Sequence, residues 1–146
     1  MDADDGFRGL DRKECLRLLA GVPVGRIVYT WHALPAVLPV NFCLDDDGAV
    51  LVRTSASSEL VGAIDAAVVA FEADEVDAAT HSGWNVVVMG TAMLVTDPAE
   101  HARLLRTGPR SWAPAPQEVF VRIDPELVTG RELVGGHTRC TVRLPS

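Results

Sequence analysis

One stretch of the sequence gathers residue types that can hold a phosphate group. Arg53 and Thr54 end a predicted strand, and the hydroxyl-rich run 55–58 leads into a predicted helix. The free N–H groups at a helix start carry partial positive charge and bind anions, and an arginine adds a fixed fork of donors. Because Ser57 or Ser58 could instead simply cap the helix, the residues alone leave two interpretations open, a phosphate site and a plain N-cap.

Other kinds of chemistry find little support in the sequence. The four histidines do not pair with one another, with cysteines or with carboxylates at metal-ligand spacing on one element. The sequence contains no G-x-S-x-G, G-x-G-x-x-G or Walker motif, which disfavours a hydrolase triad and the common nucleotide sites. We therefore expect no metal, and no residue stands out as a catalytic acid or base.

The composition limits the partners and the compartment. A net charge of −7 disfavours nucleic acid and anionic membrane surfaces. Cys15, Cys43 and Cys140 are odd in number and distant in sequence, which indicates free thiols in a reducing compartment. The chain starts without the basic and apolar pattern of a signal peptide, and the longest apolar stretch, residues 86–95, is about half a membrane span. We expect a cytoplasmic protein without a membrane segment.

The elements that must position these residues are mostly short strands. Alternation and β-branched residues predict strands over 25–31, 36–44, 49–54, 68–72, 84–96, 118–123 and 128–134. The Asp47-Gly48 turn predicts a hairpin, and Pro39 is expected at a sheet edge or bulge. Gly90 predicts a bend within a long strand. Loops are expected over 74–83 and 109–116.

Three short helices complete the prediction. Asp11 and Glu14 form a capping-box-like start for a helix that ends at Gly21. Further helices are predicted over residues 59–66 and, after Asp97 and Pro98, to about residue 106.

The resulting fold class is mainly β (α+β), with six or seven antiparallel strands in a closed or nearly closed barrel and two or three short helices. Apolar residues make up 48% and charged residues 23% of the 146 residues, a globular balance that suits one domain over residues 1–146. Residues 1–9 and 136–146 are expected to be flexible tails.

Several short segments, in this order along the chain, resemble the pyridoxamine 5′-phosphate oxidase-like family of flavin-binding split β-barrels. The segments are Leu38-Pro39-Val40-Asn41, the run from Arg53 to Leu60, Ser82-Gly83-Trp84 and Ser111-Trp112-Ala113-Pro114. The resemblance covers most of the chain, from the helix with Leu16, Leu18 and Leu19, through residues 22–26, to residues 128–131. It implies an FMN-dependent oxidoreductase that acts on a small molecule as a homodimer, with two flavin sites at the subunit interface.

The resemblance also implies roles for individual residues. Leu38, Pro39, Val40 and Asn41 match the strand along the isoalloxazine ring, Arg53, Thr54, Ser57 and Ser58 match the phosphate end, and Trp84 and Trp112 match positions near the ring that are reached from the partner subunit. For each tryptophan, packing in the core or the dimer interface is the alternative.

One position departs from the family pattern. Ser58-Glu59-Leu60 stands where the family commonly has Ser-Lys-Leu, so a carboxylate replaces the lysine that faces the phosphate. Two like charges about 5 Å apart repel by roughly 3 kcal/mol at an effective dielectric constant near 20; a Glu59 side chain that points into solvent would lose only the attraction. Two alternatives therefore remain, a reductase that uses the deazaflavin F420 and a non-catalytic dimeric binding protein that has lost its flavin affinity.

Overall fold

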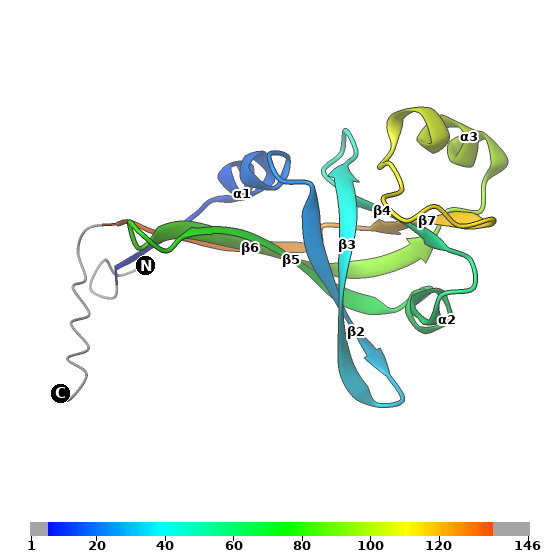
Figure 1. Ribbon diagram of the computed structural model, residues 1–146, viewed down its shortest axis with the longest axis horizontal. Helices are drawn as coiled ribbons and strands as arrows, with labels where there is room; N and C mark the ends of the chain where they lie inside the picture. Colours follow the sequence, from blue (N-terminus) through cyan, green and yellow to red (C-terminus); the bar gives the residue numbers. More distant parts are fainter. Residues whose placement is uncertain (1–5, 136–146) are drawn as a thin grey trace.

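Six antiparallel strands close into a barrel in the computed structural model, which describes residues 6–135 (Figure 1). The barrel strands are β2 (Val24–Trp31), β3 (Leu34–Leu44), β4 (Val50–Ser55), β5 (Val68–Asp77), β6 (Ser82–Leu94) and β7 (Glu118–Ile123). Two further strands, β8 (Leu127–Leu133) and β1 (Phe7–Gly9), extend the sheet beyond β6. The helices are α1 (Arg12–Leu19), α2 (Glu59–Ile64) and α3 (Pro98–Thr107).

This architecture confirms the predicted mainly-β barrel with short helices. The barrel closes because β6 pairs with β5 on one side and with β7 on the other. β1 was not predicted, and its residues fall within the expected tail 1–9; they pair with β8 from Phe7 opposite Leu133 to Gly9 opposite Arg131. The expected tail 136–146 lies outside the described residues.

The loop predicted over residues 74–83 is wrong for most of its length. β5 continues to Asp77 and β6 begins at Ser82, so only residues 78–81 form the turn. The polar residues suggested a loop, but they pair across the hairpin, with Asp74 opposite Asn85 and Asp77 opposite Ser82. Cross-strand pairing therefore overrides the low strand propensity of the acidic side chains.

The bend predicted at Gly90 marks the place where β6 changes neighbours. β6 pairs with β8 as far as Met89 and with β7 from Ala92 onward. At Gly90 the backbone passes so close to the Asp124 carbonyl that a Cβ atom would overlap it. The absence of a side chain lets the strand turn this corner of the barrel.

β3 has a free edge over much of its length, as predicted from Pro39. Residues 34–41 pair with β2, and among the described strands β4 joins β3 only from Phe42 onward. On β3 the Phe42 N–H points toward β2, where it donates to the Pro23 carbonyl, and the direction of the N–H alternates along a strand. Pro35 and Pro39 are an odd number of residues from Phe42, so an N–H at either position would point away from β2. The prolines therefore remove donors from an edge that other strands do not cover.

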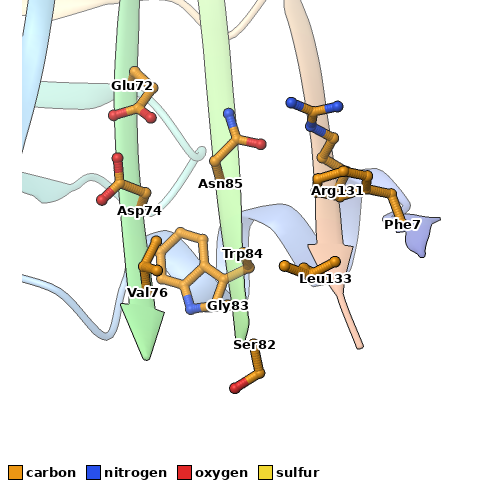
Figure 2. A pocket seen from close by; sticks show the side chains of 10 residues that line it. All are labelled: Phe7, Glu72, Asp74, Val76, Ser82, Gly83, Trp84, Asn85, Arg131 and Leu133. Atoms are coloured by element: carbon orange, nitrogen blue, oxygen red, sulfur yellow. The ribbon is translucent and has the colours of Figure 1, made fainter. Parts of the chain in front are cut away.

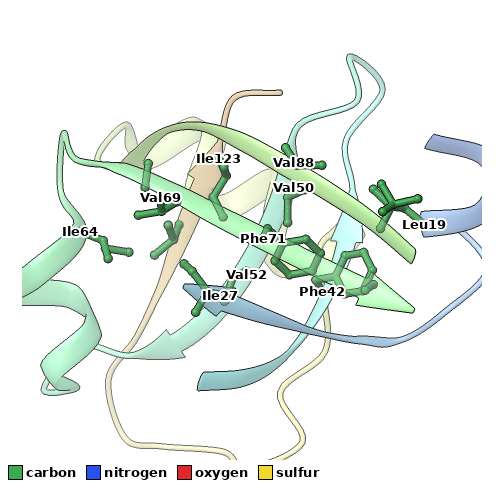
Figure 3. Packing of buried hydrophobic residues seen from close by; sticks show 14 of the residues in the cluster. Leu19, Ile27, Phe42, Val50, Val52, Ile64, Val69, Phe71, Val88 and Ile123 are labelled. Atoms are coloured by element: carbon green, nitrogen blue, oxygen red, sulfur yellow. The ribbon is translucent and has the colours of Figure 1, made fainter. Parts of the chain in front are cut away.

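The core fills the barrel and extends under α1 and α2. Phe42 and Phe71 meet edge to face with their ring centroids 4.6 Å apart, and Ile27 is fully buried (Figure 3). Leu19 from α1 and Ile64 from α2 pack into the same cluster. The two helices therefore add apolar side chains to the core of the barrel.

The predicted turn at Asp47-Gly48 and the predicted caps at Asp11 and Asp97 are confirmed. Asp11 and Asp97 each accept a hydrogen bond from the backbone N–H three residues later, at 2.8 and 3.1 Å. Gly48 adopts φ +85° in the turn between β3 and β4, and its N–H donates to the Asp45 carbonyl.

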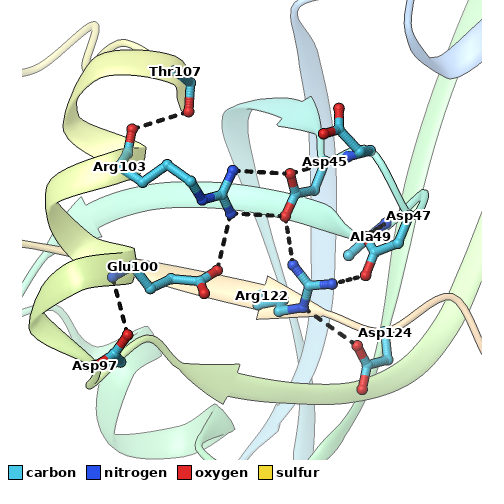
Figure 4. A network of polar contacts seen from close by, with 10 residues as sticks. Asp45, Asp47, Ala49, Asp97, Glu100, Arg103, Thr107, Arg122 and Asp124 are labelled. Atoms are coloured by element: carbon cyan, nitrogen blue, oxygen red, sulfur yellow. Dashed lines mark hydrogen bonds and ion pairs between the residues drawn. The ribbon is translucent and has the colours of Figure 1, made fainter.

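An ion-pair network joins this turn to α3 and β7. The Asp45 carboxylate accepts hydrogen bonds from Arg103 at 3.1 and 3.3 Å and from Arg122 at 2.7 Å (Figure 4). Hydrogen bonds from Arg103 and then Arg122 lower the pKa of Asp45 from 3.8 to about 2, although burial opposes the shift. The network fixes α3 beside the barrel and, with it, the start of the segment that follows α3.

Candidate functional site

A groove of about 480 Å³ lies between the free edge of β3 and the segment that links α3 to β7. We call residues 108–117 the proline loop. Seven of the ten residues predicted for the site line the groove, so the fold brings distant parts of the sequence to one place. The lining residues are Val24, Leu38, Pro39, Val40, Asn41, Arg53, Thr54, Ser55, Ser111, Trp112 and Ala113.

Arg53 supplies the cation of the groove, and part of its guanidinium group has no protein partner. Its Nη2 lies 3.3 Å from Glu118 Oε1 across β4 and β7, and its guanidinium carbon lies 5.4 Å from the centre of the Phe120 ring. The Arg53 Nε atom is buried and finds no hydrogen-bond partner within residues 6–135. A buried N–H without a partner is unfavourable, so the Arg53 guanidinium group has hydrogen-bonding capacity that the described residues do not use.

Ser58 presents a second orphaned polar atom nearby in sequence. It occupies the N-cap position of α2, but in the described part of the chain its side chain makes no capping bond, and its Oγ is buried without a partner. The plain-cap interpretation therefore does not hold for the Ser58 hydroxyl. Because α2 has only six residues, its dipole is short, and Arg53 rather than the helix start supplies the positive charge at this end of the groove.

Ser57 and Glu59 lie on either side of Ser58 and face solvent. We call residues 53–59, the connection between β4 and α2, the corner of the groove. Ser57 is exposed, and its hydroxyl lies 3.0 Å from that of Ser55, which is itself a lining residue. The Glu59 side chain is exposed at the first residue of α2. Water and salt screen the exposed charge of Glu59. Its main effect is therefore that the lysine common at this position, a second cation, is missing.

Asn41 joins the two walls of the groove. Its side-chain Nδ2 donates a short hydrogen bond to the Arg110 backbone carbonyl, at the start of the proline loop. At the other end of this loop, the Ala56 N–H donates to the Gln117 carbonyl at 2.9 Å. Between these two ties Trp112 is 65% exposed over the groove. Asn41 was predicted to contact the cofactor ring; here its amide holds the loop that carries Trp112.

Trp84 lies away from the groove, in a separate pocket of about 320 Å³ on the β5–β6 hairpin. Figure 2 shows it beside Val76, with the carboxylates of Glu72 and Asp74 farther along β5. Both carboxylates contact Arg26, at 3.3 and 3.4 Å. Burial, and then the neighbouring Asp74, raise the pKa of Glu72. The lining residues of this pocket thus include two carboxylates and one arginine, Arg131 of β8, whose guanidinium carbon lies 4.2 Å from the centre of the Phe7 ring.

Glu118 is the groove residue that sequence reasoning missed. It touches the groove only through Arg53, and the two residues are 65 positions apart. Their contact depends on the register of β4 and β7, in which Arg53 lies opposite Phe120. A local pattern carries no signal for such a pairing.

The outer face of the barrel sheet carries an apolar row. Directly paired residues point to the same face of a sheet, and five of them form a continuous line across β3, β2, β5, β6 and β8. The row consists of Val37, Val28, Ala70, Met89 and Leu127. Val37 is 62% exposed and Leu127 51% exposed. A contiguous apolar strip whose ends are exposed is typical of an interaction surface.

Residues 6–135 hold neither a cluster of metal ligands nor a membrane-spanning helix. No three His, Cys, Asp or Glu side chains come together there as a metal site. The helices in that range are too short or too polar to cross a bilayer.

Comparison with known proteins gives consistent matches. The model of the family described as pyridoxamine 5′-phosphate oxidase matches residues 11–132. The uncharacterized protein Rv0080 of Mycobacterium tuberculosis is 43% identical over 130 residues, which cover 86% of this chain and 84% of that protein.

Two solved structures are also similar to this chain. A FAD-binding protein of Mycobacterium smegmatis is 36% identical, with a TM-score of 0.78 over 88% of this chain and 100% of its own. A conserved protein of unknown function from Corynebacterium diphtheriae is 34% identical, with a TM-score of 0.75 over 89% and 100%.

Proposed function

Because the chain belongs to the pyridoxamine 5′-phosphate oxidase family, we propose that it is a flavin-dependent oxidoreductase that acts on a small molecule. FMN is the flavin that the sequence resemblance implies, and the similar M. smegmatis protein is a FAD-binding protein. Both flavins carry an isoalloxazine ring and a phosphate at the end of a ribityl chain, so one groove can serve either.

The observation that carries the proposal is Arg53, the one cation among the residues that line the groove, at the connection between β4 and α2 where two buried polar atoms lack a partner. Arg53 Nε and Ser58 Oγ are the two buried side-chain polar atoms without a partner that the described residues contain. Native proteins rarely leave such atoms unpaired unless a ligand or water completes them. A flavin phosphate at this end of the groove would accept from the Arg53 guanidinium group, and Thr54 and Ser55 line the same groove.

The ring is proposed to lie along the β3 wall. Leu38 and Val40 are half-buried there and offer apolar contact, while the prolines keep the strand edge from pairing with another strand. A bound flavin supplies hydride or electron transfer. The residues of this chain hold its phosphate, orient its ring against β3 and shield it with the proline loop.

We also propose that the protein works as a homodimer. The apolar row on the outer sheet face supports this, since a second copy would remove Val37, Met89 and Leu127 from water. In a dimer, the partner subunit's Trp84 would be free to complete the other subunit's groove, in agreement with the resemblance. The free thiols of Cys15 and Cys43 suit a reducing compartment, and we place the protein in the cytoplasm.

One alternative has an observation in its favour. Arg53 already has a carboxylate partner in Glu118, and Glu59 stands where a lysine is common, so a dimer without flavin affinity is the second candidate. An F420-dependent reductase is less favoured, because its polyglutamate tail needs cations and the groove offers Arg53 alone among its lining residues.

The visible absorption spectrum of freshly purified protein tests the proposal. We expect flavin bands, or quenching of flavin fluorescence when the apoprotein is titrated with FMN or FAD. Glu59→Lys should raise the affinity by about tenfold or more, by roughly the 1.4 kcal/mol that one favourable charge contact contributes. A colourless protein that leaves the fluorescence of both flavins unchanged would favour the cofactor-free alternative.

A further inference from the structure

We propose that the pocket on the β5–β6 hairpin is a second ligand site, which takes a short zwitterion with an ammonium group at one end and a carboxylate at the other. The pocket is separate from the groove and needs no flavin, so the site goes beyond the proposed oxidoreductase function. Three features of the pocket point to this ligand: the charges at its two ends, the amide between them and the apolar hollow beside them.

Polar side chains of the pocket lie in one row across three neighbouring strands. Asp74 on β5 pairs with Asn85 on β6, and Asn85 pairs with Arg131 on β8. Directly paired residues point to the same face of a sheet, and Figure 2 shows Asn85 between the other two side chains. The row therefore presents a carboxylate, an amide and a guanidinium group in that order.

The two ends of the row carry opposite charges that the described chain leaves unbalanced. At the β5 end, Glu72 and Asp74 share one arginine, Arg26, at 3.3 and 3.4 Å. Burial, and then the neighbouring Asp74, raise the pKa of Glu72. At the β8 end, Arg131 lies over the Phe7 ring and forms no ion pair within residues 6–135. A ligand cation is therefore attracted to the first end and a ligand anion to the second.

The distance between these ends limits the length of the ligand. Neighbouring strands are about 4.8 Å apart, so the side chains on β5 and β8 start about 10 Å from each other. One hydrogen bond of about 3 Å at each end leaves about 4 Å between the charged groups of the ligand. In the middle, the Asn85 amide makes no side-chain hydrogen bond in the described part of the chain, and it can donate or accept. This length fits a linear ω-amino acid of three or four carbon atoms.

An apolar hollow beside Asn85 suits the carbon chain of such a ligand. Gly83 lies between Val76 and Leu133 in the register of the three strands. A Cβ atom at Gly83 would overlap the Glu75 carbonyl, so a larger residue does not fit and the hollow stays open between the two apolar side chains. The whole pocket measures about 320 Å³, which is the size of a small-molecule site.

Titration of the full chain with three probes of similar length tests the proposal. The probes are 4-aminobutanoate, which carries both charges, butylamine, which carries only the cation, and butanoate, which carries only the anion. NMR spectra of the 15N-labelled protein at constant ionic strength report binding at the side chains of Asn85 and Arg131. We expect 4-aminobutanoate to bind in the millimolar range and at least tenfold more tightly than either other probe. Equal affinity for butylamine, or no change at these side chains with any probe, would overturn the proposal.

Two variants with matched controls locate the site. Arg131→Gln and Asp74→Asn each remove one charged end and should weaken the binding of 4-aminobutanoate about tenfold. Arg8→Gln, on β1 opposite Glu132, and Glu75→Gln, next to Asp74, change charges on the other face of the sheet and should leave the affinity unchanged. Equal losses in the controls would show that net charge, rather than this row, attracts the ligand. Flavin titration of the same samples is a separate measurement, so a negative result here leaves the proposed function standing.

Discussion

The side-chain amide of Asn41 on β3 donates a hydrogen bond to the backbone carbonyl of Arg110, and so ties the proline loop to the opposite wall of the groove. Asn41→Ala removes this tie. Since a neutral hydrogen bond contributes about 0.5–1.5 kcal/mol, we expect the amides of residues 108–117 to exchange with deuterium up to about tenfold faster in the apoprotein. Hydrogen–deuterium exchange with mass spectrometry measures this without any cofactor.

Trp112→Ala is the matched control for the loop. It removes the groove-facing side chain but keeps the Asn41 bond, so exchange of the loop amides should stay close to the wild-type rate. Unchanged exchange in Asn41→Ala would show that the bond does not hold the loop.

Ser58 separates ligand binding from stability. Its Oγ is buried without a partner in the part of the chain that the structure describes, so Ser58→Ala removes an unsatisfied polar atom. The apoprotein should be as stable as the wild type or more stable by up to about 1 kcal/mol, whereas flavin affinity should fall about tenfold. Urea denaturation measures the free energy of unfolding, and flavin titration measures the affinity. Ser57→Ala, at an exposed hydroxyl, should change the affinity far less.

Asp45 makes stability depend on pH in the acid range. Its pKa falls from 3.8 to about 2 in the folded state, chiefly through Arg103 and Arg122, so its contribution is complete above about pH 4. As the pH drops toward 2 the carboxylate takes up a proton and the contribution, up to about 2 kcal/mol, disappears. Asp45→Asn should therefore be less stable at pH 7 by about this amount.

The check is denaturant unfolding of both proteins between pH 7 and pH 2.5. The difference in unfolding free energy should shrink below pH 4. A difference that stays constant over the whole range would mean that the Asp45 ion pairs do not contribute to stability.

Local signals in the sequence predicted most of the fold. The Asp47-Gly48 turn, the Asp11 and Asp97 caps and the bend at Gly90 each follow from the conformational demands of a few adjacent residues. The acidic hairpin of β5 and β6 was missed because its strands are stabilised by pairing across the hairpin, which composition does not reveal. β1 was missed for the same reason, since three residues form a strand only against β8.

The residues of the candidate site could be predicted from the sequence, but the contacts between them could not. Arg53 and Ser58 stand out by residue type, and both prove to hold buried atoms without protein partners. The Arg53–Glu118 pair and the Asn41–Arg110 bond join residues 65 and 69 positions apart. Such contacts depend on how the barrel closes, and closure is a property of all six strands.

Gly90 and Gly62 should respond in opposite directions to alanine. A Cβ at Gly90 would overlap the Asp124 carbonyl at the corner of the barrel, so Gly90→Ala should lose several kcal/mol or fail to fold. Gly62 lies inside α2 with no described atom within 4 Å of the added carbon, so Gly62→Ala should gain up to about 1 kcal/mol. Thermal unfolding compares the two. Equal melting temperatures would contradict the close approach at Gly90.

The apolar row predicts that a charged substitution within it should disrupt the proposed dimer. Met89 lies within the row, between Ala70 and Leu127. Met89→Asp places a charge where a second copy would exclude water, and an unpaired buried charge destabilises an interface by several kcal/mol. We expect the proposed dimer to dissociate at micromolar concentration, as measured by light scattering after size-exclusion chromatography. Leu105→Asp adds the same charge at a 52% exposed leucine on α3 and should leave the mass unchanged.

Because the groove is proposed to be completed by the partner subunit, Met89→Asp should also weaken flavin binding in proportion to the fraction of monomer. A monomer that binds flavin as tightly as the wild type would show that one chain forms the whole site.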